Sequence, residues 1–342
     1  MKVLITGASG FVGDHLLRYL HKTAPTWKFI ACYHSTQPKF LHERITWKKV
    51  DFTDVLNLEE ITQDVNYIFH CAAIVSFDKK KGNLLIQKNT LITRNLVNAS
   101  LEKPNLKKFI HFSSVAALGR NKESNTIIDE KSHWTDSKDN SNYAISKYRS
   151  ELEVWRGIAE GLPAVILNPS LILGEDHWEN SSGKLIPIIY NEFAWYTEGI
   201  NAWVDIKDVI EIAYLLSQST ISGERFVLCE GNYSFKDIFT WIAIAFDKRP
   251  PHKFAQKWMT NIIWRWSSLV SNITKKEPTI TKETARTAQS KYYYSNKKVL
   301  NMLKGYNFTP IKETIKRISK KYIIFTELSQ HNDIISRKQT NK

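Results

Sequence analysis

The stretch KVLITGASGFVG, residues 2–13, decides the fold. An apolar run of strand length, residues 2–6, precedes three glycines spaced three apart, and leucines at helical spacing follow. Such a turn between a first strand and a helix is typical of a dinucleotide phosphate site, because glycine lets backbone approach the pyrophosphate at the helix N-terminus. A purely structural turn is the alternative. The predicted dinucleotide contacts are Gly7, Ser9, Gly10, Phe11, Val12 and Gly13.

Strand-length apolar runs alternate with segments of helical periodicity through the first half of the chain. This rhythm predicts an α/β fold with a Rossmann-type, doubly wound parallel sheet. After about residue 170 the alternation fades, which indicates a smaller, discontinuous C-terminal substrate lobe. The predicted strands are residues 2–6, 28–33, 66–71, 108–113 and 164–168. The predicted units are a dinucleotide-binding domain (1–170, with 204–230 returning to it), a substrate-binding lobe (171–203 and 231–330) and a flexible tail (331–342).

Composition excludes several classes of protein. With 42% hydrophobic and 24% charged residues, the chain is an ordinary globular protein rather than a fibrous or disordered one. The net charge of +14 is interpreted as a solvated basic surface that suits a phosphate-bearing cofactor, and no nucleic-acid partner is expected. Three widely spaced cysteines fit reduced thiols, and no metal site is predicted.

The sequence contains no apolar run of about 18 residues that would span a membrane. Because the first strand starts at once, no signal peptide is expected, and the chain is predicted to be cytoplasmic. A basic, aromatic-rich segment at residues 258–276 would suit peripheral contact with a membrane surface. Helical packing within the second lobe is the interpretation that we favour.

The end of the second predicted strand bears on the choice of dinucleotide. An acidic residue there would bind the ribose hydroxyls of NAD, but the sequence continues with His34 and Ser35. A 2′-phosphate would meet no repulsion at this position, so NADP(H) is favoured and NAD(H) is the alternative. Asp51 and Phe52, after the third strand, are predicted to contact the adenine. Alternatively, Asp51 caps the helix that starts at Val55.

A Tyr-x-x-x-Lys pattern occurs at Tyr143/Lys147, Tyr293/Lys297 and Tyr294/Lys298. Only the first lies about thirty residues after a strand ending in serine and opens an amphipathic helix. Positions i and i+4 share a helix face, so the lysine ammonium would lower the phenol pKa from its usual value of ~10. The pair is predicted to exchange a proton with a carbonyl or an alcohol. The side chains expected to face inward are Ile145, Tyr148, Leu152, Trp155 and Ala159.

Two serines follow the strand at residues 109–112, at the edge of an open sheet where ligands bind. A hydroxyl at this edge would donate a hydrogen bond to the substrate oxygen. We predict that Ser114, rather than Ser113, has this role. Capping of the local backbone is the alternative for either residue.

These blocks, in this order, resemble the extended short-chain dehydrogenases/reductases, which include sugar-nucleotide epimerases, dihydroflavonol reductases and 3β-hydroxysteroid dehydrogenases. The resemblance implies that Ser114, five residues before Gly119, is the catalytic hydroxyl, and that a homodimer is compatible with the chain. The blocks are residues 6–13, 51–52, 70–73, 89–96, 113–119, 143–147, 168–170 and 204–209. The cofactor contacts that it implies are Cys71, Ala72, Ala73, Asn89, Tyr143, Lys147, Pro169 and Ser170.

Within that family the long gap between Ser114 and Tyr143 resembles the dihydroflavonol-reductase-like branch more than the epimerases. We predict an NAD(P)(H)-dependent oxidoreductase that interconverts a carbonyl and an alcohol on a hydrophobic small molecule. One alternative is a sugar-nucleotide epimerase or dehydratase with tightly bound NAD. Another is a non-catalytic dinucleotide-sensing protein, which the intact Ser114, Tyr143 and Lys147 disfavour. The candidate substrate contacts are Val75, Ser76, Phe77, Trp178, Phe193 and Tyr196.

Overall fold

The computed structural model describes residues 1–38, 40–74, 82–101, 103–119, 127–137, 140–178, 181–260, 262, 264–265 and 282–340. Seven parallel strands form the main sheet in the order β3-β2-β1-β4-β5-β7-β11, which confirms the predicted Rossmann-type fold. The strands are β1 (Lys2–Thr6), β2 (Lys28–Tyr33), β3 (Ile45–Lys49), β4 (Tyr67–His70), β5 (Lys108–Phe112), β7 (Ala164–Pro169) and β11 (Glu224–Leu228).

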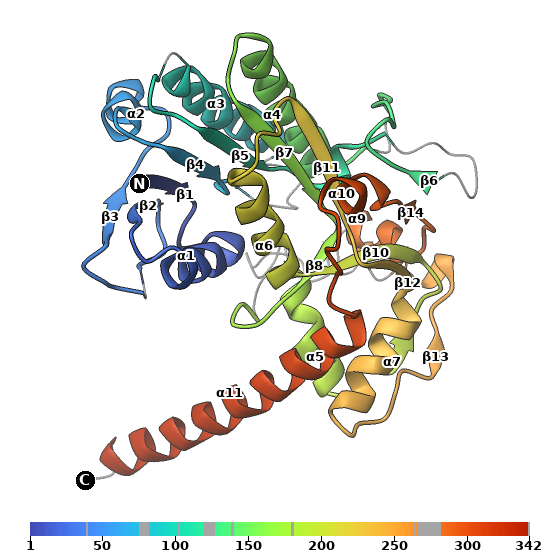
Figure 1. Ribbon diagram of the computed structural model, residues 1–342. Coiled ribbons are helices and arrows are strands. Elements are labelled where there is room, and N and C mark those ends of the chain that lie inside the picture. Colours follow the sequence, from blue (N-terminus) through green and yellow to red (C-terminus); the bar gives the residue numbers. More distant parts are fainter. Residues whose placement is uncertain are drawn as a thin grey trace.

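Helices cover both faces of this sheet (Figure 1). On one face, α1 (Phe11–Thr23) packs against α6 (Ile206–Ser217), and on the other lie α2 (Val55–Thr62), α3 (Gly82–Ser100) and α4 (Asn142–Ala159). Successive residues of β1 enter the two different cores, because strand side chains alternate between faces. Burial on both faces explains the nearly continuous apolar strands, since each fully buried Leu or Ile contributes roughly 1.5–3 kcal/mol.

After β7 the chain leaves the main sheet to build a second, three-stranded sheet in the order β12-β10-β8. Its strands are β8 (Leu171–Leu173), β10 (Ile200–Asp205) and β12 (Gly231–Ser234). The helices α5 (Leu185–Tyr190), α7 (Phe235–Ala245) and α11 (Ile311–Thr340) lie on one side of this sheet, and Trp203 is buried among them. Between β10 and β12 the chain returns through α6 and β11 to the edge of the main sheet.

Short elements complete the C-terminal part. They are η2 (Val115–Ala117), η3 (Ser181–Lys184), β6 (Ile127–Ile128) paired with β14 (Tyr293–Tyr294), β9 (Trp195–Tyr196) paired with β13 (Lys253–Phe254), α9 (Lys282–Thr287) and α10 (Lys297–Met302). Helix α11 projects from the body of the molecule and remains helical to Thr340, across most of the segment predicted to be a tail. Within the described ranges, no helix is both long and apolar enough to cross a bilayer.

The predicted inward face of α4 was wrong for Leu152 and Ala159, whereas Ile145, Tyr148 and Trp155 are half-buried and Trp155 packs against the core. Leu152 is 47% exposed and Ala159 is also exposed, whereas Lys147 and Glu151 are buried. The reason is that part of the buried face of α4 covers polar groups at the strand ends, where Lys147 and Glu151 find hydrogen-bond partners, while Val154 continues the hydrophobic core. Gly157 lets α4 approach α3 closely, since a Cβ there would lie 2.6 Å from Val97 Cγ1.

Candidate active site

The glycine turn after β1 forms a cradle from backbone alone. Gly7 has φ +66°, and a Cβ on it would lie 2.8 Å from Ala72 Cα at the end of β4. A Cβ on Gly13 would lie only 2.2 Å from the Gly7 carbonyl oxygen. Gly10, the N-cap of α1, supplies no side-chain acceptor to the first-turn N–H groups, which therefore suit a phosphate. This cradle fits a dinucleotide.

The adenosine end of the predicted site lies after β2 and β3, where His34 and Asp51 are neighbours. The Asp51 carboxylate accepts hydrogen bonds from Thr53 N at 2.9 Å and Thr53 Oγ1 at 2.8 Å. These bonds lower the pKa of Asp51, and the charge of His34 acts in the same direction. The capping alternative for Asp51 was wrong, because Asp54 caps α2 by accepting from Asn57 N. Phe52 is buried beneath this region.

A buried histidine joins the ends of β1 and β4. The Thr93 hydroxyl donates to the Asn89 carbonyl at 3.0 Å, so its oxygen accepts from His70 Nε2 at 3.1 Å. His70 Nδ1 must then accept from Thr6 Oγ1 at 2.8 Å, and Thr6 in turn accepts from Ala72 N at 3.1 Å. Burial lowers the pKa of His70 to about 3, so the ring is neutral. This chain of bonds holds β4 in place against the glycine turn.

Asn89, a predicted cofactor contact, is committed to the protein itself. Its side-chain oxygen accepts from Ile74 N at 2.8 Å, and its nitrogen donates to Ile74 O at 2.9 Å and Ser146 Oγ at 3.3 Å. Asn89 therefore fixes the segment that follows Ala72 and Ala73 and ties it to α4. The candidate substrate contacts Val75, Ser76 and Phe77 lie outside the described residues.

The two serines after β5 point to different partners. Ser113 is buried, and its hydroxyl donates to Glu151 Oε2 at 2.7 Å, so it is turned toward α4. Ser114 is half-buried, and its hydroxyl oxygen accepts from Ala116 N at 3.1 Å at the start of η2. The backbone cap that the sequence left open therefore exists at Ser114. Its hydroxyl hydrogen is not used in that bond and remains a donor.

Tyr143 and Lys147 lie one turn apart at the start of α4, whose N-cap Ser141 accepts from Ala144 N at 3.0 Å. Lys147 is buried, and its ammonium donates to the Phe112 carbonyl at 2.9 Å, directly before the two serines. Burial lowers the pKa of Lys147 to about 8, while Cys71 and Glu151 act in the opposite direction. The structure thus brings the predicted lysine to the strand end that carries Ser114.

The end of β7 completes this edge with Pro169 and Ser170. Ser170 is only 8% exposed, and its hydroxyl has no hydrogen-bond partner in the described part of the chain. A buried hydroxyl needs a partner, and the polar carboxamide of a nicotinamide would supply one. Together with the glycine cradle, this orphaned hydroxyl fits a bound nicotinamide dinucleotide.

Two residues that the sequence analysis did not select, Glu151 and Arg225, lie beneath this edge in an ion pair of 2.9 Å. Spacing carried a signal for Glu151, since it follows Lys147 by four residues and so shares its helix face. Arg225 offered no such signal, because its proximity arises from the pairing of β11 with β7.

The candidate substrate residues of the second lobe separate into two kinds. Trp178 is 7% exposed and packs edge-to-face on Tyr322 of α11, so its expected substrate role is corrected to packing in the lobe's core. Phe193 is 38% exposed. Tyr196 is half-buried, with Phe254 at 5.8 Å and the Lys236 ammonium 4.8 Å above its ring. The substrate contacts of Phe193 and Tyr196 stay a prediction.

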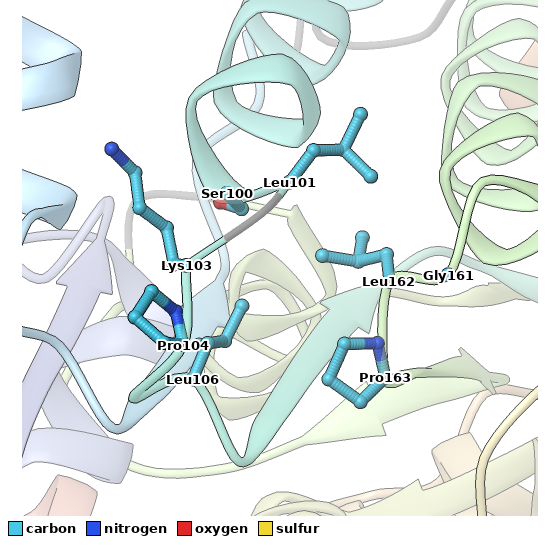
Figure 2. A pocket seen from close by; sticks show the side chains of 8 residues that line it. All are labelled: Ser100, Leu101, Lys103, Pro104, Leu106, Gly161, Leu162 and Pro163. Carbon is cyan, nitrogen blue, oxygen red and sulfur yellow. The ribbon is translucent and has the colours of Figure 1, made fainter.

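A cavity of about 350 Å³ lies at the opposite end of the sheet (Figure 2). It is formed where α3 and α4 end and where β5 and β7 begin, whereas the candidate active site lies where these strands end. No described cluster of His, Cys, Asp or Glu side chains is arranged to hold a metal ion. The cavity lining consists of Ser100, Leu101, Lys103, Pro104, Leu106, Gly161, Leu162 and Pro163.

A family model for the NAD dependent epimerase/dehydratase family matches residues 3–229, a range that runs from β1 to the end of β11. The chain belongs to this family. It is 24% identical to cinnamoyl-CoA reductase 1 of Petunia hybrida over 93% of this chain and 92% of that protein. It is 26% identical to a putative dihydroflavonol 4-reductase of a Synechocystis species, over 86% and 87%.

Solved structures share the fold of this epimerase/dehydratase family member. UDP-glucose 4-epimerase from Thermotoga maritima, solved with UDP-glucose, superposes with a TM-score of 0.74 over 95% of this chain and 100% of that chain. At 18% identity this likeness concerns the fold alone. With its reductase relatives, the chain is an NAD(P)-dependent enzyme of the extended short-chain dehydrogenase/reductase type.

Proposed function

We propose that this enzyme reversibly reduces a carbonyl group on a hydrophobic small molecule, with NADPH as the preferred coenzyme. One observation carries the proposal: the buried Lys147 ammonium donates a hydrogen bond to the carbonyl of Phe112, which lies two residues before Ser114. Lys147 and Ser114 therefore lie at the strand ends beside the glycine cradle, and Tyr143 precedes Lys147 by one turn of the same helix. The names of the two reductase relatives support carbonyl reduction over epimerisation.

The residues divide the chemistry among them. A nicotinamide coenzyme held at the glycine cradle would supply the hydride for the carbonyl carbon. Ser114 donates a hydrogen bond to the carbonyl oxygen and holds it in place, and Tyr143 transfers its phenolic proton to that oxygen as the alcohol forms. The Lys147 cation lowers the cost of the phenolate that remains on Tyr143. In the reverse direction the phenolate accepts the alcohol proton.

The first experiment separates a reductase from an epimerase or dehydratase. Purified protein is denatured and checked for bound nucleotide, and folded protein is then titrated with NADPH and NADH by quenching of its tryptophan fluorescence. We expect exchangeable binding that favours NADPH, followed by NADPH oxidation with members of a panel of aromatic aldehydes and ketones. Stoichiometric NAD retained by the protein, with no carbonyl reduction, would replace this proposal with the epimerase/dehydratase alternative.

Tyr143→Phe tests the proton donor. The variant should lose turnover by at least about 10²-fold, the usual contribution of a general acid, and should retain its affinity for NADPH. Tyr293→Phe is the matched control, because it makes the same change in a second Tyr-x-x-x-Lys pattern and should leave turnover unchanged. Equal activity of the two variants would exclude the proposed mechanism.

The proposed preference for NADPH rests on the residue after β2. His34→Asp would place a carboxylate where the 2′-phosphate is expected and would offer an acceptor to the ribose hydroxyls of NAD. We expect the ratio of NADH to NADPH affinity to rise by about tenfold or more in fluorescence titrations, which corresponds to roughly 1.4 kcal/mol. An unchanged ratio would show that His34 does not face the 2′-position.

A further inference from the structure

The side chain of Glu151 is the centre of a buried hydrogen-bond cluster beneath Ser114. It is 2% exposed and lies on α4, one turn beyond Lys147. Its Oε2 accepts from Ser113 Oγ at 2.7 Å and from Asn168 Nδ2 at 2.9 Å. Its Oε1 accepts from Arg225 Nη1 at 2.9 Å and Trp155 Nε1 at 3.3 Å. Four donors thus converge on two carboxylate oxygens.

Asn168 connects this carboxylate to Ser114. Its nitrogen donates both to Glu151 Oε2 and to the Ser114 carbonyl at 3.0 Å, and Asn168 is fully buried. Because both partners are acceptors, the orientation of the amide is determined and both of its hydrogens are used. The Ser114 carbonyl also accepts from Ala117 N at 3.0 Å, and the Ser114 hydroxyl oxygen accepts from Ala116 N.

Arg225 holds the carboxylate from the other side. Its guanidinium also donates to the Glu130 carbonyl, from Nε at 2.9 Å and from Nη2 at 2.6 Å. Glu130 precedes α4 in the chain, and its carboxylate accepts from Val227 N at 2.8 Å. The arginine therefore joins the edge strand β11 to α4 and to the segment that leads into α4.

We propose that Glu151 is a positioning residue that orients Ser114 through Asn168, with Arg225 fixing the carboxylate. The inference rests on the proposed function in one respect, namely that Ser114 contacts the substrate oxygen. A carboxylate is required because a carboxamide at this position has one acceptor oxygen, so its NH₂ group would face two of the four donors. Loss of the second acceptor would release either Arg225 or the Asn168 amide that holds Ser114.

Hydrogen exchange measured by mass spectrometry tests this inference without a substrate. The amides of Ala116 and Ala117 are bonded to Ser114 itself, so a peptide that spans residues 113–119 reports its position. We expect Glu151→Gln to accelerate exchange in this peptide by about tenfold, while peptides from β1 and α6 exchange as before. Glu153→Gln is the matched control, because it makes the same change in a surface ion pair with Arg156 on the same helix.

Two outcomes would overturn the proposal. One is unchanged exchange in residues 113–119, and the other is an equal acceleration in every peptide, which would indicate a merely structural role. Arg225→Lys keeps the cation but loses the bonds to the Glu130 carbonyl, so it provides a second variant if Glu151→Gln does not fold. It should accelerate the same peptide by about threefold, and its unchanged exchange would equally contradict the proposal.

Steady-state kinetics provide a second test, with the aldehyde or ketone of the panel that is reduced fastest. Glu151→Gln should lower kcat by about tenfold or more and leave the KM for NADPH unchanged. In a Ser114→Ala background the same change should cost less than about twofold, because the residue acts through Ser114. A full additional loss there would contradict the inference. If Tyr143→Phe stays active, the proposed function fails, but the exchange result still decides the role of Glu151.

Discussion

The turn after β1 and the layer beneath α4 meet at the same edge of the sheet, but the turn excludes side chains whereas the layer depends on them. At the turn, a single added Cβ on Gly13 would overlap the Gly7 carbonyl. Beneath α4, the side chain of Glu151 is only 2% exposed, and four donors replace the water that its carboxylate loses. The comparison teaches that one part of this sheet edge is sensitive to atoms gained and the other part to atoms lost.

The largest expected effect comes from adding one carbon atom to the turn. Gly13→Ala places a Cβ 2.2 Å from a backbone oxygen, so the turn must open and the phosphate cradle is lost. We expect NADPH affinity to fall by at least about 10³-fold, or roughly 4 kcal/mol, in fluorescence titrations. Gly10→Ala is the control, because its Cβ would lie 3.2 Å from the same oxygen, and it should cost far less. Equal losses of NADPH affinity in the two variants would show that the clash at Gly13 is not what sets the effect.

Removing the buried cation should have the next largest effect, on stability. The pKa of Lys147 falls from 10.5 to about 8 in the folded chain, so between these values the unfolded chain binds more protons. Below pH 8 the folded chain therefore carries the full cost of the buried charge. As pH rises from 8 to 10.5, the free energy of unfolding should rise by roughly 3 kcal/mol. Urea unfolding across this range should show the rise in the parent chain, and Lys147→Met should lack it. An identical pH dependence in both would contradict the burial.

The smallest expected effect lies where the two regions join. Thr6→Val removes the hydroxyl that bridges His70 and Ala72 and leaves a buried imidazole nitrogen without its donor. Such a loss costs roughly 1–3 kcal/mol, and we expect the free energy of unfolding to fall by this amount in urea titrations. NADPH affinity should weaken by less than about tenfold, since the glycines are untouched. A loss of affinity as large as that of Gly13→Ala would show that the bridge, rather than the missing side chains, shapes the cradle.

The same contrast explains how much of the molecule the sequence revealed. The glycine turn and the strand rhythm are local patterns, so the parallel sheet and the positions of Gly7, Ser114, Tyr143 and Lys147 at one edge were predictable. The ends of the third strand were harder to predict, because Lys48 and Lys49 interrupt its apolar run.

Contacts between distant segments could not be predicted in this way. The ion pair of Arg225 with Glu151 joins residues 74 positions apart. Glu151 can be buried on α4 because Ser113, Asn168 and Arg225 supply donors from the ends of three strands or from within them. Trp178 was expected at the substrate because it is aromatic and follows the sheet. It is covered by Tyr322 of α11, whose position depends on the packing of the whole second lobe.

The spacing of Tyr143, Lys147 and Glu151 at intervals of four residues on α4 has a consequence for how this enzyme can change in evolution. One residue inserted between Tyr143 and Glu151 would rotate the rest of the helix by about 100° and carry the later side chains away from their partners. An insertion in this stretch would therefore break the alignment of the three residues in one step. The connection from β5 to α4 lies outside this helical spacing. Its length can therefore differ between descendants while the chemistry persists.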